Sequence, residues 1–116
     1  NQQRAIELKV TAALASAYAR LVNAHDEAVA LRDHALPPSE AAYRDIRQAY
    51  DGGNLGYLDV LDAERTLIDL RRNYLDALAE YHSAAAELEG LIGQSLDSVD
   101  HQAKPELQET QPTEAE

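Results

Sequence analysis

The chain has 116 residues, a formal net charge of −11 at pH 7, and no Cys, Met, Trp or Phe. So large a negative charge argues against nucleic-acid binding, because phosphate neutralisation needs clustered Lys and Arg. The lack of Cys excludes disulfides and thiolate metal sites, and no apolar run is long enough for a membrane-spanning helix. Ala, Leu, Val, Ile and Tyr make up the 45% apolar fraction, which favours a single all-α domain. Because the chain begins at Asn1 without a signal peptide, we expect a fragment or a processed form.

The first helical arm is predicted over about residues 3–51. Apolar residues recur there in steps of three and four, which is typical of a narrow heptad seam. Its members are Val10, Leu14, Ala17, Leu21, Ala24, Ala28, Leu31 and Ala35. The pair Pro37-Pro38 interrupts this pattern, so the helix should kink or restart there. The seam resumes at Ala42, Ile46 and Ala49 almost in phase, which favours a kink in one rod over a domain boundary.

A turn is predicted at residues 52–54, where Gly52 and Gly53 can adopt positive φ at little cost. Asn54 is a candidate N-cap for the next helix. Asp59 and Asp62 then fall in its first turns and share one face, where carboxylates oppose the positive helix end.

The second arm is predicted over about residues 55–92, antiparallel to the first. Its seam is regular: Val60, Ala63, Leu67, Leu70, Tyr74, Ala77, Tyr81, Ala84, Leu88 and Leu91. A second stripe flanks it: Leu61, Ile68, Leu75, Leu78, Ala85 and Ile92. Two adjacent stripes indicate neighbours on two sides of this helix. Gly93 is a natural helix stop, so we expect a long α-helical hairpin over residues 1–93 and a disordered acidic tail over 94–116.

Residues 36–93 resemble the second-repeat helical hairpin of TolC-type outer membrane efflux proteins. The similarity is strongest to the branch that partners heavy-metal and related resistance-nodulation-division pumps. The matching elements, in order, are LP, AYxxG, DVLDA and AxxxYHxAxAxLExLIG, and the long helix before them fits residues 5–35. The resemblance implies a trimeric periplasmic helical tunnel that reaches the outer membrane through a β-barrel region not contained in this chain. It also implies a passive export conduit that docks a periplasmic adaptor and an inner-membrane pump.

The resemblance further implies roles for residues at the turn. Asp59 and Asp62 match carboxylates at the pore entrance, and Tyr50 and Gly53 match gating and tip positions. The adaptor would contact the tip at Gly52, Gly53, Asn54 and Leu55. At Leu55 the best-known members carry a gating arginine, so the closed-state latch is absent here or is built from other residues.

Each of these residues also has a purely structural interpretation. Asp59 and Asp62 are also suitable first-turn acids, and Tyr50 can simply cover the end of the hairpin. Tyr74 and Tyr81 are interpreted as core residues. His25, His34, His82 and His101 form no metal-ligand spacing, so they are interpreted as surface residues and no metal or other cofactor is predicted. No nucleophile elbow or Gly-rich phosphate loop supports an enzyme.

Two functions from different classes are therefore open. One is a segment of an outer-membrane efflux channel, exposed to the periplasm. The other is a free-standing helical hairpin that binds partner helices as an adaptor-like coiled coil. The second stripe and the acid pair beside the turn favour the channel, because a two-helix module needs only one seam.

Overall fold

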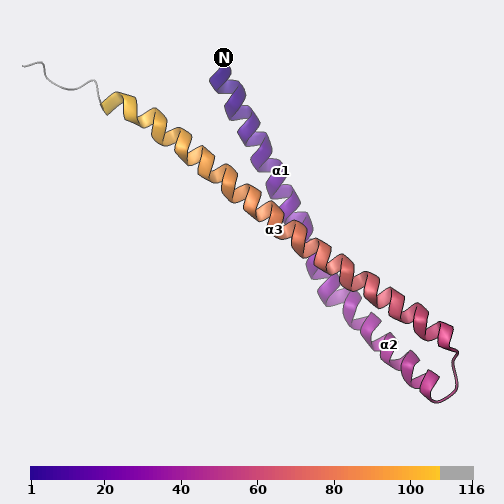
Figure 1. Cartoon of the computed structure of the whole chain (residues 1–116). Coiled ribbons are helices and arrows are strands. Elements are labelled where there is room, and N and C mark those ends of the chain that lie inside the picture. Colours follow the sequence, from indigo (N-terminus) through magenta and orange to yellow (C-terminus); the bar gives the residue numbers. More distant parts are fainter. Residues whose placement is uncertain (108–116) are drawn as a thin grey trace, which may run out of the picture.

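The computed structural model describes the backbone of residues 1–107 and the side chains up to His101. Within that range the chain is helical except at one turn. Helix α1 spans Gln2–Ala30, a π-helical turn η1 spans Leu31–Ala35, α2 spans Leu36–Asp51 and α3 spans Tyr57–Leu107. Helices α1, η1 and α2 form one arm, and α3 runs back antiparallel to them (Figure 1). The predicted all-α hairpin is confirmed.

The two arms cross near the middle of the molecule, and the beginning of α1 lies apart from the last part of α3 (Figure 1). With 51 residues, α3 is about 76 Å long at 1.5 Å per residue. It extends past the start of α1, so its last turns have no helical neighbour on the first arm. Within the part of the chain that the structure describes, no helix is long and apolar enough to cross a membrane.

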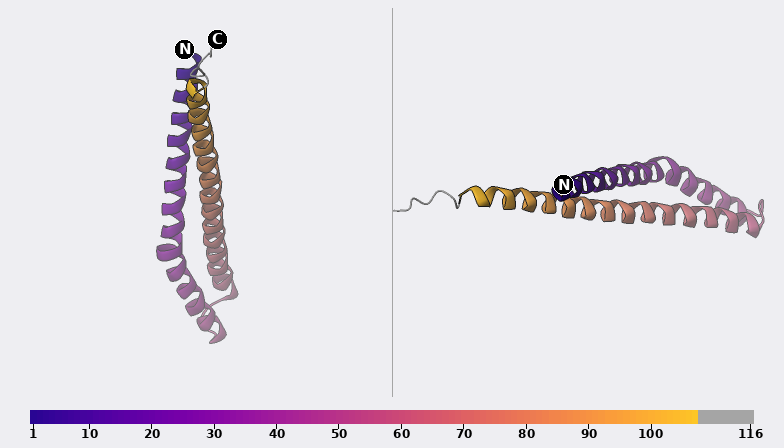
Figure 2. Two further views of the ribbon diagram at one scale, coloured as in Figure 1. Left: turned by 90° about the vertical axis from the view of Figure 1, so that its left-hand side faces the viewer. Right: turned by 90° about the horizontal axis from the view of Figure 1, so that it is seen from above.

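The first arm bends at η1, directly before the two prolines (Figure 2). Pro37 and Pro38 occupy the first turn of α2 and have no N–H to donate to the carbonyls four residues earlier. The backbone accommodates them with a wider turn, in which the N–H of Leu36 bonds to the carbonyl of Leu31, five residues back. The predicted kink is confirmed, and its physical form is a π-turn rather than a break.

The inner face of α3 follows the predicted seam from Val60 to Leu91. All ten predicted positions from Val60 to Leu91 are buried or half-buried. The buried core is nevertheless narrow, because five of its seven members are alanine: Ala17, Ala24, Ala28, Val60, Leu67, Ala77 and Ala84. Small side chains allow the two backbones to approach closely, so contact area accumulates along the length of the arms rather than in a thick core.

The seam prediction is wrong at one position of α2. Ala42 is exposed, and its neighbour Tyr43 is half-buried between the arms, as are Ser39 and Ile46. The reason is the π-turn, which adds a residue to one turn and rotates the following helix relative to the heptad pattern of α1. The sequence pattern assumed unbroken α-helical geometry, so it placed Ala42 rather than Tyr43 on the inner face, whereas the predicted Ile46 and Ala49 are both half-buried.

The expected helix end at Gly93 is also not observed, because α3 continues through this glycine to Leu107. A glycine ends a helix efficiently when it adopts positive φ, and Gly53 is the one glycine in the described residues that does so. Gly93 is an ordinary interior helical residue, which costs about 0.5–1 kcal/mol relative to alanine without breaking the helix. Residues 108–116 of the expected tail lie outside the described residues.

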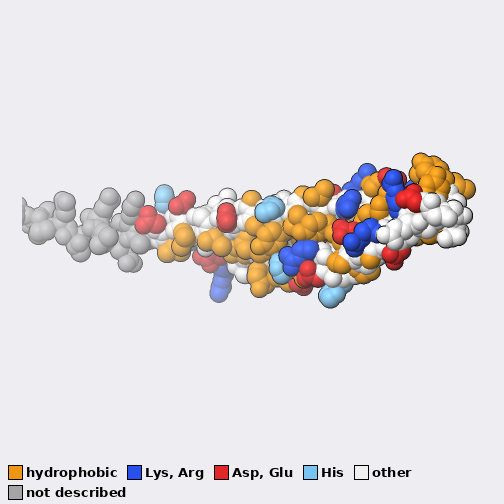
Figure 3. Space-filling model, turned by 90° about the horizontal axis from the view of Figure 1, so that it is seen from below, with side chains coloured by type: hydrophobic (Ala, Val, Ile, Leu, Met, Phe, Trp, Pro, Cys, Tyr) orange, Lys and Arg blue, Asp and Glu red, His pale blue; other side chains and the backbone are white. Residues whose placement is uncertain are grey.

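The predicted second stripe of α3 lies largely on the surface. Leu61, Ile68, Leu75 and Ile92 are 38–64% exposed, and Leu78 and Ala85 are half-buried. Hydrophobic side chains are accordingly visible along much of the length of the hairpin in a space-filling view (Figure 3). The first arm therefore covers one apolar stripe of α3, and the second stripe has no helical partner among the residues that the structure describes.

Candidate functional site at the hairpin tip

The tip begins where α2 ends in a Schellman motif. The N–H of Gly53 bonds to the carbonyl of Tyr50 at 3.0 Å, and the N–H of Asn54 bonds to the carbonyl of Ala49 at 2.8 Å. Gly53 takes the left-handed conformation that this motif requires, with φ +79°, whereas Gly52 keeps φ −80°. The sequence correctly identified the turn, and the structure assigns its left-handed position to the second glycine.

Helix α3 starts later than the sequence suggested, at Tyr57, so Asn54 is not its N-cap. Gly56 has this role: its carbonyl accepts the N–H of Asp59 at 3.2 Å. In return, the carboxylate of Asp59 accepts the N–H of Gly56 at 3.2 Å, a reciprocal pair that resembles a capping box. Asn54 instead belongs to the preceding Schellman motif, which is why the turn is longer than predicted.

The acid pair lies in the first two turns of α3. Asp59 and Asp62 are both exposed and three residues apart, so they occupy neighbouring places on one face of the helix. The structure gives Asp59 a local task, because its carboxylate accepts the Gly56 N–H, while Asp62 carries its charge one turn further along. Both carboxylates also lie near the positive end of the α3 dipole, where negative side chains stabilise a helix.

Two tyrosines close the tip. The rings of Tyr50, near the end of α2, and Tyr57, the first residue of α3, lie 5.8 Å apart between centroids and are tilted by 51°. This geometry is typical of a favourable aromatic pair. Tyr50 therefore covers the end of the hairpin, which agrees with its structural interpretation, and its predicted gating role is not tested by this contact.

An apolar surface at the tip was only partly anticipated. Leu55 is 39% exposed, Tyr57 58% and Leu58 75%, and hydrophobic side chains gather at the tip end of the molecule (Figure 3). Of these three residues, only Leu55 belongs to the adaptor contact predicted from the sequence at residues 52–55. The sequence could have indicated that Tyr57 and Leu58 are exposed, because both come before Val60, where the alternating three- and four-residue steps of the α3 seam begin.

Ion pairs between the arms were missed altogether. Arg20 on α1 bonds to Glu80 on α3 at 2.8 Å and also to Glu87, one heptad further along α3. The hydrogen bond to Glu80, followed by the Coulombic attraction of that carboxylate, raises the pKa of Arg20 above its usual value. Closer to the tip, Arg71 and Glu40 lie 3.7 Å apart. The seven-residue spacing of Glu80 and Glu87 could have indicated an ion-pair site, because it places both carboxylates on the same edge of the helix.

The histidines lie apart from the tip. All four are exposed; His25 packs near Tyr81 with ring centroids 6.0 Å apart, and His101 approaches the carbonyl of Asp97 at 3.1 Å. Over the described part of the chain, no group of three or more His, Asp or Glu side chains is arranged to hold a metal ion.

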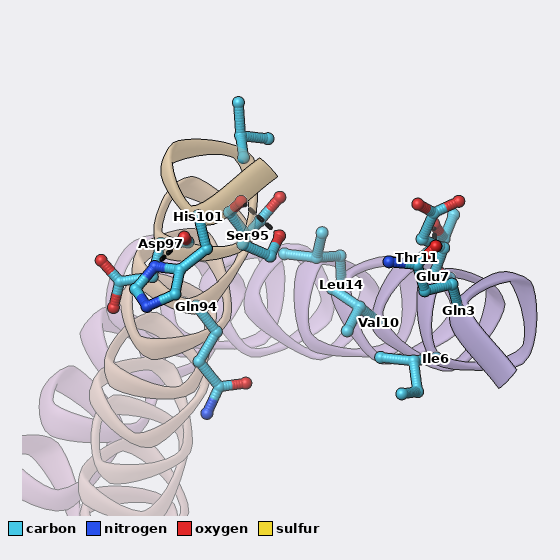
Figure 4. A pocket seen from close by; sticks show the side chains of 12 residues that line it. Gln3, Ile6, Glu7, Val10, Thr11, Leu14, Gln94, Ser95, Asp97 and His101 are labelled. Carbon is cyan, nitrogen blue, oxygen red and sulfur yellow. Dashed lines mark hydrogen bonds between the residues drawn. The ribbon is translucent and has the colours of Figure 1, made fainter. Parts of the chain in front are cut away.

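A separate cleft of about 800 Å³ opens between the beginning of α1 and residues 94–101 of α3, where the arms diverge (Figure 4). Ile6, Val10 and Leu14 from α1 line one side, and Gln94, Ser95 and His101 from α3 line the other. The cleft is open, and its otherwise apolar and neutral polar lining includes the ionisable side chains of Glu7, Asp97 and His101. The Ser98 hydroxyl donates to the carbonyl of Ser95 at 2.8 Å, so this polar group bonds to the backbone of its own helix.

Comparison with known proteins gives one curated relative of note. The cobalt-zinc-cadmium resistance protein CzcC of Cupriavidus metallidurans is 36% identical to this chain over 63 residues. The aligned region covers 54% of this chain and 15% of CzcC, so the chain corresponds to a small part of that protein. No protein-family model and no solved structure matches the sequence.

Proposed function

We propose that this chain is a segment of an outer-membrane efflux channel: a helical hairpin of the periplasmic tunnel, with its tip at the tunnel entrance. The observation that carries the proposal is the tip itself. A Schellman motif and a reciprocal Gly56–Asp59 pair define the turn, and exposed carboxylates stand directly beside it. Similarity to a metal-resistance protein and the resemblance to TolC-type efflux proteins support the same assignment.

In this proposal the channel is a passive conduit and the hairpin performs no chemistry. Asp59 and Asp62 form part of a ring of carboxylates at the entrance, contributed by three copies of the full protein. Such a ring attracts cations, because charges gathered in a narrow mouth add their potentials. Tyr50 and Gly53 shape the entrance.

The partners in this proposal meet the tip. A periplasmic adaptor, and through it an inner-membrane pump, would contact residues 52–55. The exposed side chains of Leu55, Tyr57 and Leu58 extend this contact surface, because apolar groups concentrated on a projecting turn are suited to docking. The uncovered stripe of α3 also favours a wall of several helices over a two-helix adaptor module, whose single seam would already be satisfied.

The test replaces both aspartates, Asp59→Asn and Asp62→Asn, in the channel that contains this hairpin, reconstituted in a planar bilayer. Asparagine preserves side-chain size and removes the charge, at a cost of about 0.5 kcal/mol each from the weakened helix-end interaction. We expect lower selectivity for cations over anions and loss of block by trivalent cations. The matched control is Asp97→Asn with Asp100→Asn, which removes the same charge about 57 Å away along α3.

Loss of selectivity in the tip variant with none in the control supports the entrance assignment. If selectivity and trivalent block survive in the tip variant, the two aspartates are ordinary helix-start acids. The pore assignment would then fail.

A further inference from the structure

Helix α2 is a regular segment between two irregular pieces of backbone. At its start, the π-turn η1 and the prolines Pro37 and Pro38 replace ordinary α-helical geometry. At its end, three of the residues 52–56 that separate it from α3 are glycine. A π-turn is a local insertion in an α-helix, and glycine adopts many backbone conformations. Both ends of α2 can therefore change conformation without unfolding the helix between them.

The contact of α2 with α3 is looser than that of α1 with α3. Three alanines of α1 are buried, whereas in the described structure neither η1 nor α2 contributes a buried residue. Arg20 ties α1 to two carboxylates of α3, whereas Glu40 of α2 lies 3.7 Å from Arg71. The Tyr43 hydroxyl accepts a hydrogen bond from Arg47 at 3.1 Å, and this bond turns with the helix because both residues belong to α2. Helix α2 can therefore change its orientation on α3 while α1 stays in place.

The sequence of α2 supplies two alternative inner faces. The observed face is formed around Tyr43, with Ser39 and Ile46. The face that continues the heptad pattern of α1 contains Ala42, Ile46 and Ala49. Consecutive residues lie about 100° apart around an α-helix, so a rotation of less than this angle exchanges one face for the other and leaves Ile46 inward in both. Every side chain of the second face is apolar, so α3 can pack against it as well.

A hollow beside Tyr43 provides the space for this rotation. It is open, measures about 530 Å³, and is lined from α2 by Glu40, Tyr43 and Arg44 but not by Ala42. Ala42 and Arg44 flank Tyr43 on opposite sides of the helix. The rotation that carries the Tyr43 ring into the hollow therefore brings Ala42 to the inner face and moves Arg44 outwards. Its cost in ion pairs is the long contact between Glu40 and Arg71.

The same rotation reaches the tip of the hairpin. Tyr50 follows Tyr43 by seven residues, so it lies two turns further along nearly the same face of α2. Its ring pairs with that of Tyr57 at the start of α3, with centroids 5.8 Å apart. Rotation of α2 thus turns Tyr50 relative to Tyr57 and alters the closure of the tip.

We propose that α2 is a two-state rotating helix, and that the π-turn before Pro37 selects its state. In the first state the π-turn is present, Tyr43 faces α3 and Tyr50 pairs with Tyr57. In the second state η1 is regularly α-helical, Ala42 faces α3 and the Tyr43 ring fills the hollow. The prolines favour the first state, because in a regular α-helix each clashes with the carbonyl four residues earlier. The device depends on the hairpin alone and is independent of the proposed channel.

Because the chain has no cysteine, disulfide trapping reports which face of α2 points towards α3. Leu67 lines the hollow from α3 and provides the common partner, as Leu67→Cys. Among disulfide-bonded monomers, Tyr43→Cys should link fastest, Ala42→Cys more slowly, and the matched control Arg44→Cys most slowly. Replacing both prolines by alanine should raise the rate for Ala42→Cys relative to Tyr43→Cys by roughly tenfold, because the second state loses its steric penalty. Equal rates for Ala42→Cys and Arg44→Cys in both backgrounds would overturn the proposal.

A second measurement needs no change in the core. Single Ala42→Cys and Arg44→Cys chains are alkylated with and without the substitutions Pro37→Ala and Pro38→Ala, and circular dichroism confirms that each chain keeps its helices. The alanine substitutions should slow alkylation at position 42 by roughly tenfold and leave it unchanged at position 44. Unchanged alkylation at position 42, or equal slowing at both positions, would show that α2 does not rotate and would overturn the proposal.

Discussion

Substituting the two adjacent glycines of the tip should have opposite effects on stability, although the sequence does not distinguish them. Gly53 has φ +79°, where a Cβ atom costs about 1–2 kcal/mol. A Cβ built on Gly53 has no atom within 4 Å, so this cost is backbone strain alone. Alanine recovers about 0.4–1 kcal/mol by restricting the unfolded chain, so Gly53→Ala should destabilise the hairpin by about 1 kcal/mol.

Gly52 is the matched control. Its φ is −80°, and a Cβ there would lie 3.5 Å from the carbonyl oxygen of Gln48, at ordinary van der Waals distance. Gly52→Ala should therefore be neutral or stabilise by about 0.5 kcal/mol through the same unfolded-state effect. Gly53→Asn should lie between the two alanine variants, because asparagine tolerates positive φ better than alanine does.

Thermal unfolding followed by circular dichroism at one fixed protein concentration measures these differences, and the concentration must be constant because association raises Tm. A loss of 1 kcal/mol corresponds to about 4 °C for a domain of this size. The reasoning is refuted if Gly53→Ala and Gly52→Ala melt at the same temperature, since the left-handed turn would then not hold the hairpin closed.

Two further predictions concern the length of α3. Leu67→Ala, at one of the two buried core positions that are larger than alanine, should cost about 2–3 kcal/mol in urea unfolding, whereas the exposed Leu58→Ala should change stability by less than about 0.5 kcal/mol. Equal effects would mean that the seam is not the core. Gly93→Ala should raise helicity and stabilise by about 0.5 kcal/mol, because Gly93 is an interior helical residue with open space around it. A destabilised variant would instead indicate that Gly93 ends the helix in solution, as its sequence context suggested.

The sequence alone determined the features that depend on local chemistry. Every position that the three- and four-residue steps from Val60 to Leu91 predicted to face inward is buried or half-buried, because a helix repeats its faces regularly. Two consecutive glycines marked the turn, because glycine permits positive φ. Two consecutive prolines marked the bend, because proline lacks the N–H that a helix requires. The carboxylates beside the turn were identified for the same reason, while their predicted entrance role stays a proposal.

The tertiary structure determined the features that depend on how the two helical arms are aligned with each other. The π-turn before Pro37 rotated α2 and exchanged Ala42 for Tyr43 at the inner face, and no local pattern states how a backbone absorbs two prolines. The pairing of Arg20 with Glu80 and Glu87 depends on how the two arms are aligned, which sequence periodicity does not determine. The same alignment left the second stripe of α3 on the surface. Because one helical arm can cover only one face of its partner, the stripe needs a neighbour from outside the chain.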